Sequence, residues 1–247
     1  MNHVIRPPEP AQRDKAELFR RLNTQPQLLE LSNVWDVTSA RAVAGRPGTT
    51  AIATASAAIA ASHGYEDGEH IPWALHLACL QRICAAVTLP VTVDIERGYG
   101  DPVATVRDVV RAGAVGVNLE DALSPVAEFA ATITAIAGTA ANDGVPLMIN
   151  ARTDEYLLSS SPSLTSAIDR CHAYLDAGAD CVFVPGLTDP DAIAALVSQV
   201  GRQRISLLAL PGIPTAAELE RLGVARLSCG PALHDAVATF IGAWGSS

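Results

Sequence analysis

The sequence predicts a single α/β barrel of eight parallel strands, on three observations. Its 247 residues match the roughly 250 typical of one such barrel. Short runs rich in Val, Ile and Leu alternate with segments of helical periodicity. These runs are almost continuously apolar, as in parallel strands that helices cover. We expect residues 1–247 to form this one domain, with an N-terminal extension and helix at 1–24. A doubly wound open sheet is the structural alternative, although no glycine-rich phosphate-binding motif follows the first strand.

The elements follow one another at regular intervals. Strands are predicted near residues 28–35, 49–55, 90–96, 114–120, 146–152, 181–185, 205–210 and 225–229. Helices are predicted at 105–111, 125–140, 166–177, 191–200 and 216–222. Proline or a capping residue begins several of them. Gly113 and Gly178 each stand in an Ala-Gly-Ala triplet that ends a helix directly before a strand.

Composition favours a small-molecule partner. Apolar residues make up 49% of the chain and charged residues 17%, as in a protein with one large core. The net charge of -9, with no Lys/Arg-rich tract, argues against nucleic acid or an anionic membrane as the main partner. No secretory signal or membrane-spanning run is evident. The five scattered cysteines make no CxxC, which suits a reducing compartment, so we expect a cytoplasmic protein.

Polar side chains two residues apart end three consecutive predicted strands. Residues at this spacing share one face of a strand, and catalytic groups of a barrel lie where its strands end. The pairs are Asp94 and Glu96, Asn118 and Glu120, and Asn150 and Arg152. If three carboxylates converge to about 4 Å, each like-charge pair costs about 4 kcal/mol at an effective dielectric near 20, so a cation is needed. Oxygen ligands without clustered His or Cys favour Mg²⁺, or Mn²⁺ in its place, over Zn²⁺.

These charges also have a purely structural explanation. Salt-bridged side chains inside a barrel, or charged helix caps, would leave the same pattern. This alternative weighs most at Asp121 and Asp154, which lie just beyond the pairs. Ser56 could equally be a helix N-cap, and Trp35 could equally pack in the core.

Longer motifs along the chain carry a resemblance to a known family. They are residues 32–41, 56–58, 64–69, Asp94-Ile95-Glu96-Arg97-Gly98-Tyr99-Gly100, Asn118-Leu119-Glu120-Asp121, 150–154, 177–180 and 230–231. Together they resemble the isocitrate lyase/phosphoenolpyruvate mutase superfamily over nearly the whole chain. The resemblance implies a magnesium-dependent barrel enzyme that acts on an α-oxo or 2-hydroxy carboxylic acid. Members make or break C–C or C–P bonds next to the oxo carbon through an enolate-like intermediate.

The resemblance also implies a role for individual residues. Asp94 would bind magnesium directly, and Glu96 and Glu120 would hold it through water. Arg152 would face the leaving or transferring group, and Asp67 would close over the site from the loop after the second strand. The residues implied to contact substrate are Trp35, Ser56, Ala57, Ala58, Asp94, Asn118, Asn150 and Arg152.

One loop departs from the resemblance. Lyases of the superfamily carry a Lys-Lys/Arg-Cys-Gly-His segment after the fourth strand, and the phosphonate enzymes carry a longer gating loop there. Here Glu120-Asp121 runs through Ala122-Leu123-Ser124 directly to Pro125. The chain therefore resembles a short-loop bacterial-type subgroup whose proton donor is unassigned. His63, His70 and His234 are candidates, with surface or loop histidines as the alternative.

Three functions stay open on the sequence. The first is a magnesium-dependent lyase of a C–C bond, including decarboxylation of an oxaloacetate-like compound. The second is a C–P enzyme of the phosphoenolpyruvate mutase or phosphonopyruvate hydrolase type, and the third is a non-catalytic oxo-acid-binding protein. The resemblance further implies a homo-oligomer, a tetramer or dimer, in which a C-terminal helix, here 235–244, is exchanged between subunits.

Overall fold

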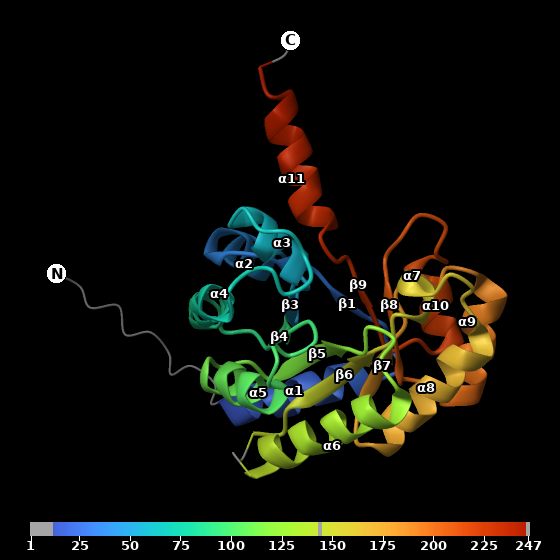
Figure 1. Cartoon of the computed structure of the whole chain (residues 1–247). Helices are drawn as coiled ribbons and strands as arrows, with labels where there is room; N and C mark the ends of the chain where they lie inside the picture. The colour runs from blue at the N-terminus through green and yellow to red at the C-terminus, as the bar shows by residue number, and fades with distance from the viewer. Residues whose placement is uncertain (1–11, 143–144, 246–247) are drawn as a thin grey trace.

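The strands of the protein close into a barrel. The computed structural model describes residues 12–142 and 145–245, and its parallel sheet has the order β1-β9-β8-β7-β6-β5-β4-β3-β2 (Figure 1). The strands are β1 (Leu29–Leu31), β2 (Asn33–Val34), β3 (Ile52–Thr54), β4 (Val91–Asp94), β5 (Gly116–Glu120), β6 (Met148–Arg152), β7 (Cys181–Phe183), β8 (Ile205–Leu208) and β9 (Arg226–Ser228). Because β1 pairs with β9 and β2 pairs with β3, residues 29–34 join both edges of the sheet and serve as one barrel strand. The predicted barrel is confirmed, and the open-sheet alternative is wrong.

Helices follow the strands and pack against one another in sequence order, α4 on α5, α5 on α6 and α6 on α8. They are α1 (Gln12–Thr24), α2 (Val37–Ala44), α3 (Ser56–Ser62), α4 (Trp73–Ala86), α5 (Pro102–Arg111), α6 (Val126–Asn142), α7 (Glu155–Leu158), α8 (Leu164–Asp176), α9 (Pro190–Val200), α10 (Ala216–Leu222) and α11 (Ala232–Ala243). The expected N-terminal extension falls on residues 1–11, outside the described residues. No helix of the described chain is both long and apolar enough to cross a membrane.

Local sequence explains where several helices begin and end. α5 begins three residues earlier than predicted, because the Asp101 side chain accepts a hydrogen bond from the backbone N–H of Ala104 and Pro102 occupies the first turn. Asp189 caps α9 in the same way. Gly113 and Gly178 have φ of 101° and 108°, the left-handed region that a residue after a helix C-terminus adopts. The predicted glycine turns before β5 and β7 are therefore confirmed.

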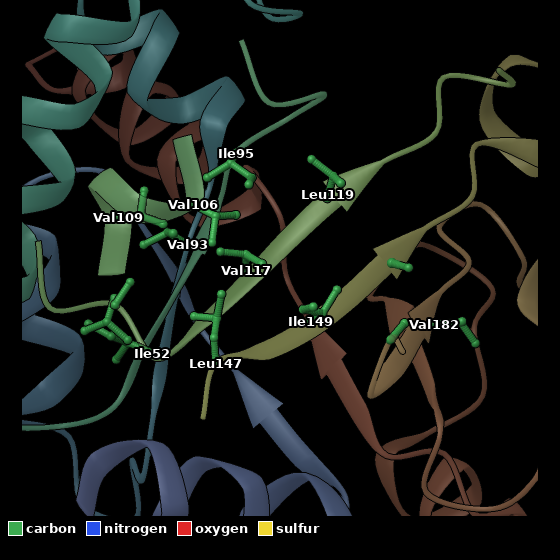
Figure 2. Close-up of a cluster of buried hydrophobic side chains, with 14 of the residues drawn as sticks. Ile52, Val93, Ile95, Val106, Val109, Val117, Leu119, Leu147, Ile149 and Val182 are labelled. Carbon is green, nitrogen blue, oxygen red and sulfur yellow. The ribbon is translucent and has the colours of Figure 1, made fainter. Parts of the chain in front are cut away.

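Two layers of buried side chains hold the barrel. Outward-facing residues of the strands pack against the surrounding helices, as Figure 2 shows for Val93 and Val117 beside Val106 and Val109. Inside, α1 closes the amino-terminal end of the barrel, where Phe19 packs among residues at the strand starts. The opposite, carboxyl end is the end left for a site.

The last helix leaves the barrel. Figure 1 shows α11 projecting away from the other helices, and none of its residues is buried. Large apolar side chains on it and just after it are exposed: Val237, Phe240, Ile241 and Trp244.

Candidate active site

A pocket of about 180 Å³ lies at the carboxyl ends of the strands. Six of the residues predicted for the site line it: Ser56, Ala57, Asp67, Asp94, Asn118 and Arg152. The other predicted residues do not form its wall: Trp35, Ala58, Glu96, Glu120 and Asn150. The predicted set therefore divides into residues that line the pocket and residues that lie outside its lining.

Asp94 is the carboxylate held most firmly toward the pocket. Its Oδ2 accepts a hydrogen bond of 2.9 Å from the Ser56 hydroxyl, and its Oδ1 accepts one of 3.2 Å from the backbone N–H of Glu96. Its own backbone N–H donates to Thr54 Oγ1 at 3.0 Å. Ser56 is the first residue of α3, whose N-terminus has no side-chain cap. Ser56 thus joins α3 to Asp94 instead of capping the helix, and the first-turn N–H groups keep no side-chain partner.

Glu96 is held by a buried aromatic network. Its carboxylate accepts hydrogen bonds from the Tyr99 hydroxyl and from the backbone N–H of Glu69. His76 Nδ1 lies 2.7 Å from the same hydroxyl. Because the single hydroxyl proton goes to Glu96, His76 must donate from Nδ1, and burial lowers its pKa to about 4, so it is neutral. The pKa of Glu96 is raised, chiefly by burial.

The loop that carries Asp67 is tied to the loop after β4. Glu69 Oε1 accepts hydrogen bonds from the backbone N–H groups of Arg97 at 3.1 Å and Tyr99 at 2.6 Å. These contacts hold Asp67 at the pocket wall. The pKa of Asp67 is raised by desolvation and by the nearby charge of Asp94. Two carboxylates therefore share the pocket.

Arg152 is paired on both sides. Its Nη1 lies 2.8 Å from Glu120 Oε2, and its Nε lies 2.6 Å from Asp154 Oδ1. Despite this pair, burial raises the pKa of Glu120 to about 8, with Arg152 opposing the shift and Asp94 adding to it. The three side chains form a chain of ion pairs in which Asp154 is buried and Arg152 and Glu120 are partly exposed.

Asp121 belongs to the structural framework. Its Oδ1 accepts hydrogen bonds from the backbone N–H groups of Leu123 and Asp154, and its Oδ2 accepts from Arg170 at 2.9 Å and from Tyr174 at 2.6 Å. The side chain has no exposed surface. The structural alternative raised for Asp121 is thus the observed arrangement.

Asn118 and Asn150 lie at different depths. Asn150 is fully buried and donates from Nδ2 to Asn118 Oδ1 at 2.9 Å. Arg226, also fully buried, donates to the same oxygen at 3.0 Å. Since Oδ1 of Asn118 is used by these two donors, its Nδ2 is the atom left for the pocket. In this structure Asn150 does not line the pocket and is joined to it through Asn118, so its direct contact with substrate stays a prediction.

The side chains of Ala58 and Trp35 also do not line the pocket, and the predicted contacts of Trp35 and of the Ala58 backbone N–H stay predictions. Ala58 is buried behind Ala57 in α3. The Trp35 ring packs edge-on against His234, with ring centroids 5.1 Å apart. Of the other histidines, His63 and His70 are exposed and bond to the backbone of Ile59 and Asp67. None of the three histidines lines the pocket.

The loop after β5 is as short as predicted. Ala122 and Leu123 take positive φ, 44° and 59°, and α6 begins at Val126. Positive φ is uncommon for residues other than glycine, and the buried contacts of Asp121 hold the turn. No cysteine lines the pocket, so the described residues offer no counterpart to the lyase cysteine.

The oxygen donors fit a hard divalent cation. Within residues 12–142 and 145–245, no three His, Cys, Asp or Glu side chains are already gathered as a metal-binding group. Water-mediated contact from Glu96 and Glu120, as the resemblance implies, needs no such direct group. Asp94 raises the pKa of Asp67, Glu96 and Glu120 alike, which marks an excess of negative charge around it. A cation at Asp94 would relieve that excess.

Comparison with known proteins decides the family. Residues 19–244 match the family model described as phosphoenolpyruvate phosphomutase. The chain belongs to the phosphoenolpyruvate mutase/isocitrate lyase superfamily. This superfamily is one of enzymes, both lyases and mutases.

Three relatives illustrate the range of the superfamily. An uncharacterized protein of Mycobacterium tuberculosis H37Rv is 38% identical over 223 residues, 88% of this chain and 83% of its own. The 2-methylisocitrate lyase of Bacillus subtilis 168 is 31% identical over 72% of this chain and 62% of its own length. A crystal structure from Burkholderia cenocepacia J2315, provisionally described as a phosphonomutase, superposes with a TM-score of 0.89 at 41% identity, covering 95% of this chain and 100% of its own.

Several residues of this superfamily member were missed by sequence reasoning. Glu69 lies in a motif that carries the resemblance, but its backbone-binding role depends on a contact 28 to 30 residues away. Arg226 lies 108 residues from Asn118 and looks like any strand residue in the sequence. The pocket wall formed by Phe183 and Leu208 also escaped notice, because apolar residues at strand ends are indistinguishable from core.

Proposed function

We propose that the protein is a magnesium-dependent lyase that acts on an α-oxo or 2-hydroxy carboxylic acid and cleaves the C–C bond next to the oxo carbon. The observation that carries this proposal is the Ser56–Asp94 contact at the pocket wall, with Glu96 and Glu120 behind it. The Asp94 carboxylate is suited to a cation, and the Ser56 hydroxyl beside it would bind the substrate's anionic end.

Asp94 would hold the metal directly, and Glu96 and Glu120 would hold it through water. Mn²⁺ would be a working substitute. Bound Mg²⁺ would act as a Lewis acid where negative charge grows on the substrate oxygen. Tyr99 and Glu69 fix the Glu96 carboxylate, and Arg152 fixes that of Glu120. Such preorganised groups stabilise the transition state without reorganising during the reaction.

The chain's own residues would orient the acid. Ser56 and the backbone N–H groups of Ala57 and Ala58 would hold the substrate carboxylate. Asn118 would donate from Nδ2, because its Oδ1 already accepts from Asn150 and Arg226. Asp67 would cover the pocket and exclude water during bond cleavage. Arg152 would present its remaining N–H groups to the bond that breaks.

A C–P enzyme is the second candidate. It is favoured by the matched family model and by the 41% identical structural relative. It is disfavoured by the short loop after β5, which brings no lysine or asparagine to the site. A phosphonate would have to share the pocket with Asp67 and Asp94 and with a guanidinium that is already paired.

We propose further that the protein is cytoplasmic and acts as a homo-oligomer, a tetramer or dimer. The exposed apolar side chains of α11 would pack on a second copy of the chain. Mass measurement in solution tests this, and a monomeric mass would contradict it.

Turnover tests the lyase proposal. The protein is incubated with Mg²⁺ and, separately, oxaloacetate, 2-methylisocitrate or phosphonopyruvate, and both pyruvate and phosphoenolpyruvate are measured. Asp94→Ala should abolish turnover, and Asp191→Ala, an exposed acid on α9, should not. Turnover that survives chelation and Asp94→Ala would exclude the metal-dependent mechanism. Turnover of phosphonopyruvate alone would favour the second candidate, and tight oxo-acid binding without any turnover would favour a non-catalytic binding protein.

A further inference from the structure

The pocket has a polar half and an apolar half. Most of its polar lining comes from the residues at β3 to β6: Ser56, Asp67, Asp94, Asn118 and Arg152, with Asn33 of β2 and Ser228 of β9 beside them. Its apolar lining comes from α7, β7, β8 and the segments after β7 and β9: Leu157, Phe183, Pro185, Leu208 and Pro231. The two halves meet between β6 and β7, where Arg152 and Phe183 are Cα partners on neighbouring strands.

The apolar half is part of the barrel framework. Phe183 ends β7 and is 6% exposed. Leu208 ends β8, and a Cβ added to Gly230 would come within 2.9 Å of its Cδ1, so Leu208 packs directly against that turn. Leu157, on the short helix α7, is 44% exposed and lies at the rim. This wall is thus preformed, and its outer rim is open to solvent.

The same half offers no cationic side chain to a second anionic group; the polar side chain at its edge is that of Ser228, at the end of β9. Among the described residues that line the pocket, Arg152 is the one with a cationic side chain, and Glu120 and Asp154 occupy its Nη1 and Nε. Arg226 is fully buried beneath Asn118 and does not reach the wall. Beyond the remaining N–H groups of Arg152, which are assigned to the bond that breaks, a second carboxylate would lose its hydration and lie against hydrocarbon or the carboxylates of Asp67 and Asp94, which is unfavourable.

We propose that the substrate carries one anionic end and an uncharged alkyl group that lies against Phe183, Leu208 and Leu157. The oxo- or hydroxy-acid end occupies the polar half, and this inference rests on the proposed function for that end. For the proposed cleavage to balance, the substrate class is a 4-hydroxy-2-oxo monocarboxylic acid with an alkyl group on C4: breaking the C3–C4 bond releases an uncharged aldehyde, leaves the electron pair on the pyruvate enolate, and the C4 hydroxyl proton is returned to C3. It differs from tricarboxylates such as the substrate named for the Bacillus subtilis relative.

Calorimetric binding with Mg²⁺ tests the inference without requiring turnover. Pyruvate, 2-oxobutanoate and 2-oxopentanoate form a series of growing alkyl chain, and 2-oxoglutarate places a carboxylate where 2-oxopentanoate has its methyl. Each added methylene should tighten Kd about fourfold. The Kd of 2-oxoglutarate should be at least about tenfold weaker than that of 2-oxopentanoate.

A pair of variants on α7 supplies a matched control. Leu157→Lys brings a cation to the pocket rim, and Leu158→Lys makes the same change at a neighbour that is 59% exposed and does not line the pocket. Both positions are exposed, so both variants should fold. Leu157→Lys should lower the Kd of 2-oxoglutarate about tenfold relative to the Kd of 2-oxopentanoate. Leu158→Lys should leave the ratio of these two Kd values unchanged.

The outcomes separate this inference from the proposed function. Magnesium-dependent binding in which 2-oxoglutarate outcompetes 2-oxopentanoate would overturn the inference alone, as would equal shifts in Leu157→Lys and Leu158→Lys. If no 2-oxo acid binds in the presence of Mg²⁺, the proposed function fails and the inference fails with it.

Discussion

Arg152 Nη1 lies 2.8 Å from Glu120 Oε2, and the two residues are Cα partners on the neighbouring strands β6 and β5. The cation expected to meet the substrate is thus joined to an acid expected to hold the metal. A change at either side chain should be felt at the other. This coupling makes the pair the natural starting point for testing the site.

Arg152→Lys should lower kcat by about 10²-fold. Lysine keeps the positive charge but is a single point donor, so it cannot hold Glu120 and Asp154 at once as the planar guanidinium does. Steady-state kinetics at saturating Mg²⁺ measure the change. The control is Arg107→Lys on the exposed face of α5. Equal kcat values for Arg152→Lys and Arg107→Lys would show that catalysis does not depend on the planar guanidinium of Arg152.

Magnesium affinity should rise with pH. Burial raises the pKa of Glu120 to about 8, so this carboxyl carries a proton at neutral pH in the metal-free protein. Cation binding must displace that proton, and Kd should tighten by up to about tenfold per pH unit between pH 6 and 8 and then level off. Calorimetry across this range measures it, and Glu120→Gln should flatten the profile. A wild-type Kd independent of pH would contradict the expectation.

The raised pKa of Glu120 also makes the stability of the metal-free fold depend on pH. In the metal-free protein the folded state binds a proton on Glu120 that the unfolded chain releases near pH 4.5. The contribution of the Glu120 proton to folding stability is therefore complete below pH 4.5 and is lost as pH rises toward about 8. Across this range the free energy of unfolding should fall by at most about 1.4 kcal/mol per pH unit. Saturating Mg²⁺ should oppose this loss, which denaturation with and without the metal can measure.

Tyr99→Phe should weaken magnesium binding about tenfold while leaving kcat at saturating Mg²⁺ nearly unchanged. The variant removes the hydroxyl that holds Glu96 but keeps the ring, which lies 4.9 Å from that of Trp73. Titration of activity against Mg²⁺ separates the two parameters. Tyr65→Phe, at an exposed tyrosine, is the matched control. A drop in kcat with unchanged metal affinity would mean that Tyr99 acts on the substrate instead.

Asp121→Asn should destabilise the fold by about 3–5 kcal/mol, because it breaks a buried ion pair and leaves Arg170 with only the longer 3.8 Å ion-pair contact to Glu155. Urea denaturation measures the free energy of unfolding. Asp169→Asn, an exposed change on the same α8 helix that carries Arg170, should shift it by less than about 0.5 kcal/mol. If Asp121→Asn were as stable as the wild type but no longer bound the metal, Asp121 would have a role in the active site instead of in the fold.

Much of the fold was predictable because its signals are local. Apolar strand runs, capping residues and the glycines at 113 and 178 act over a few residues. Spacing also predicted the placement of Asp94, Asn118 and Arg152 on the inner face. It could not predict depth: Asn150 shares a face with Arg152 but lies one layer lower, where it is fully buried.

What sequence reasoning could not reach depends on register and on distant contacts. The Arg152–Glu120 pair requires the alignment of β5 with β6, and the Arg226–Asn118 bond joins residues 108 apart. The division of the pocket into polar and apolar halves requires knowing which strand neighbours which. None of these relations has a periodic signature.

Binding of oxalate, a planar mimic of a pyruvate enolate, tests the central claim most directly. Calorimetry is run on the wild type and Asp94→Asn, each with Mg²⁺ and with chelator. We predict that wild-type protein binds oxalate only with Mg²⁺, and that Asp94→Asn loses this binding while remaining folded. Oxalate binding of equal strength with Mg²⁺ and with chelator, or binding unaffected by Asp94→Asn, would contradict a metal-dependent oxo-acid site at Asp94.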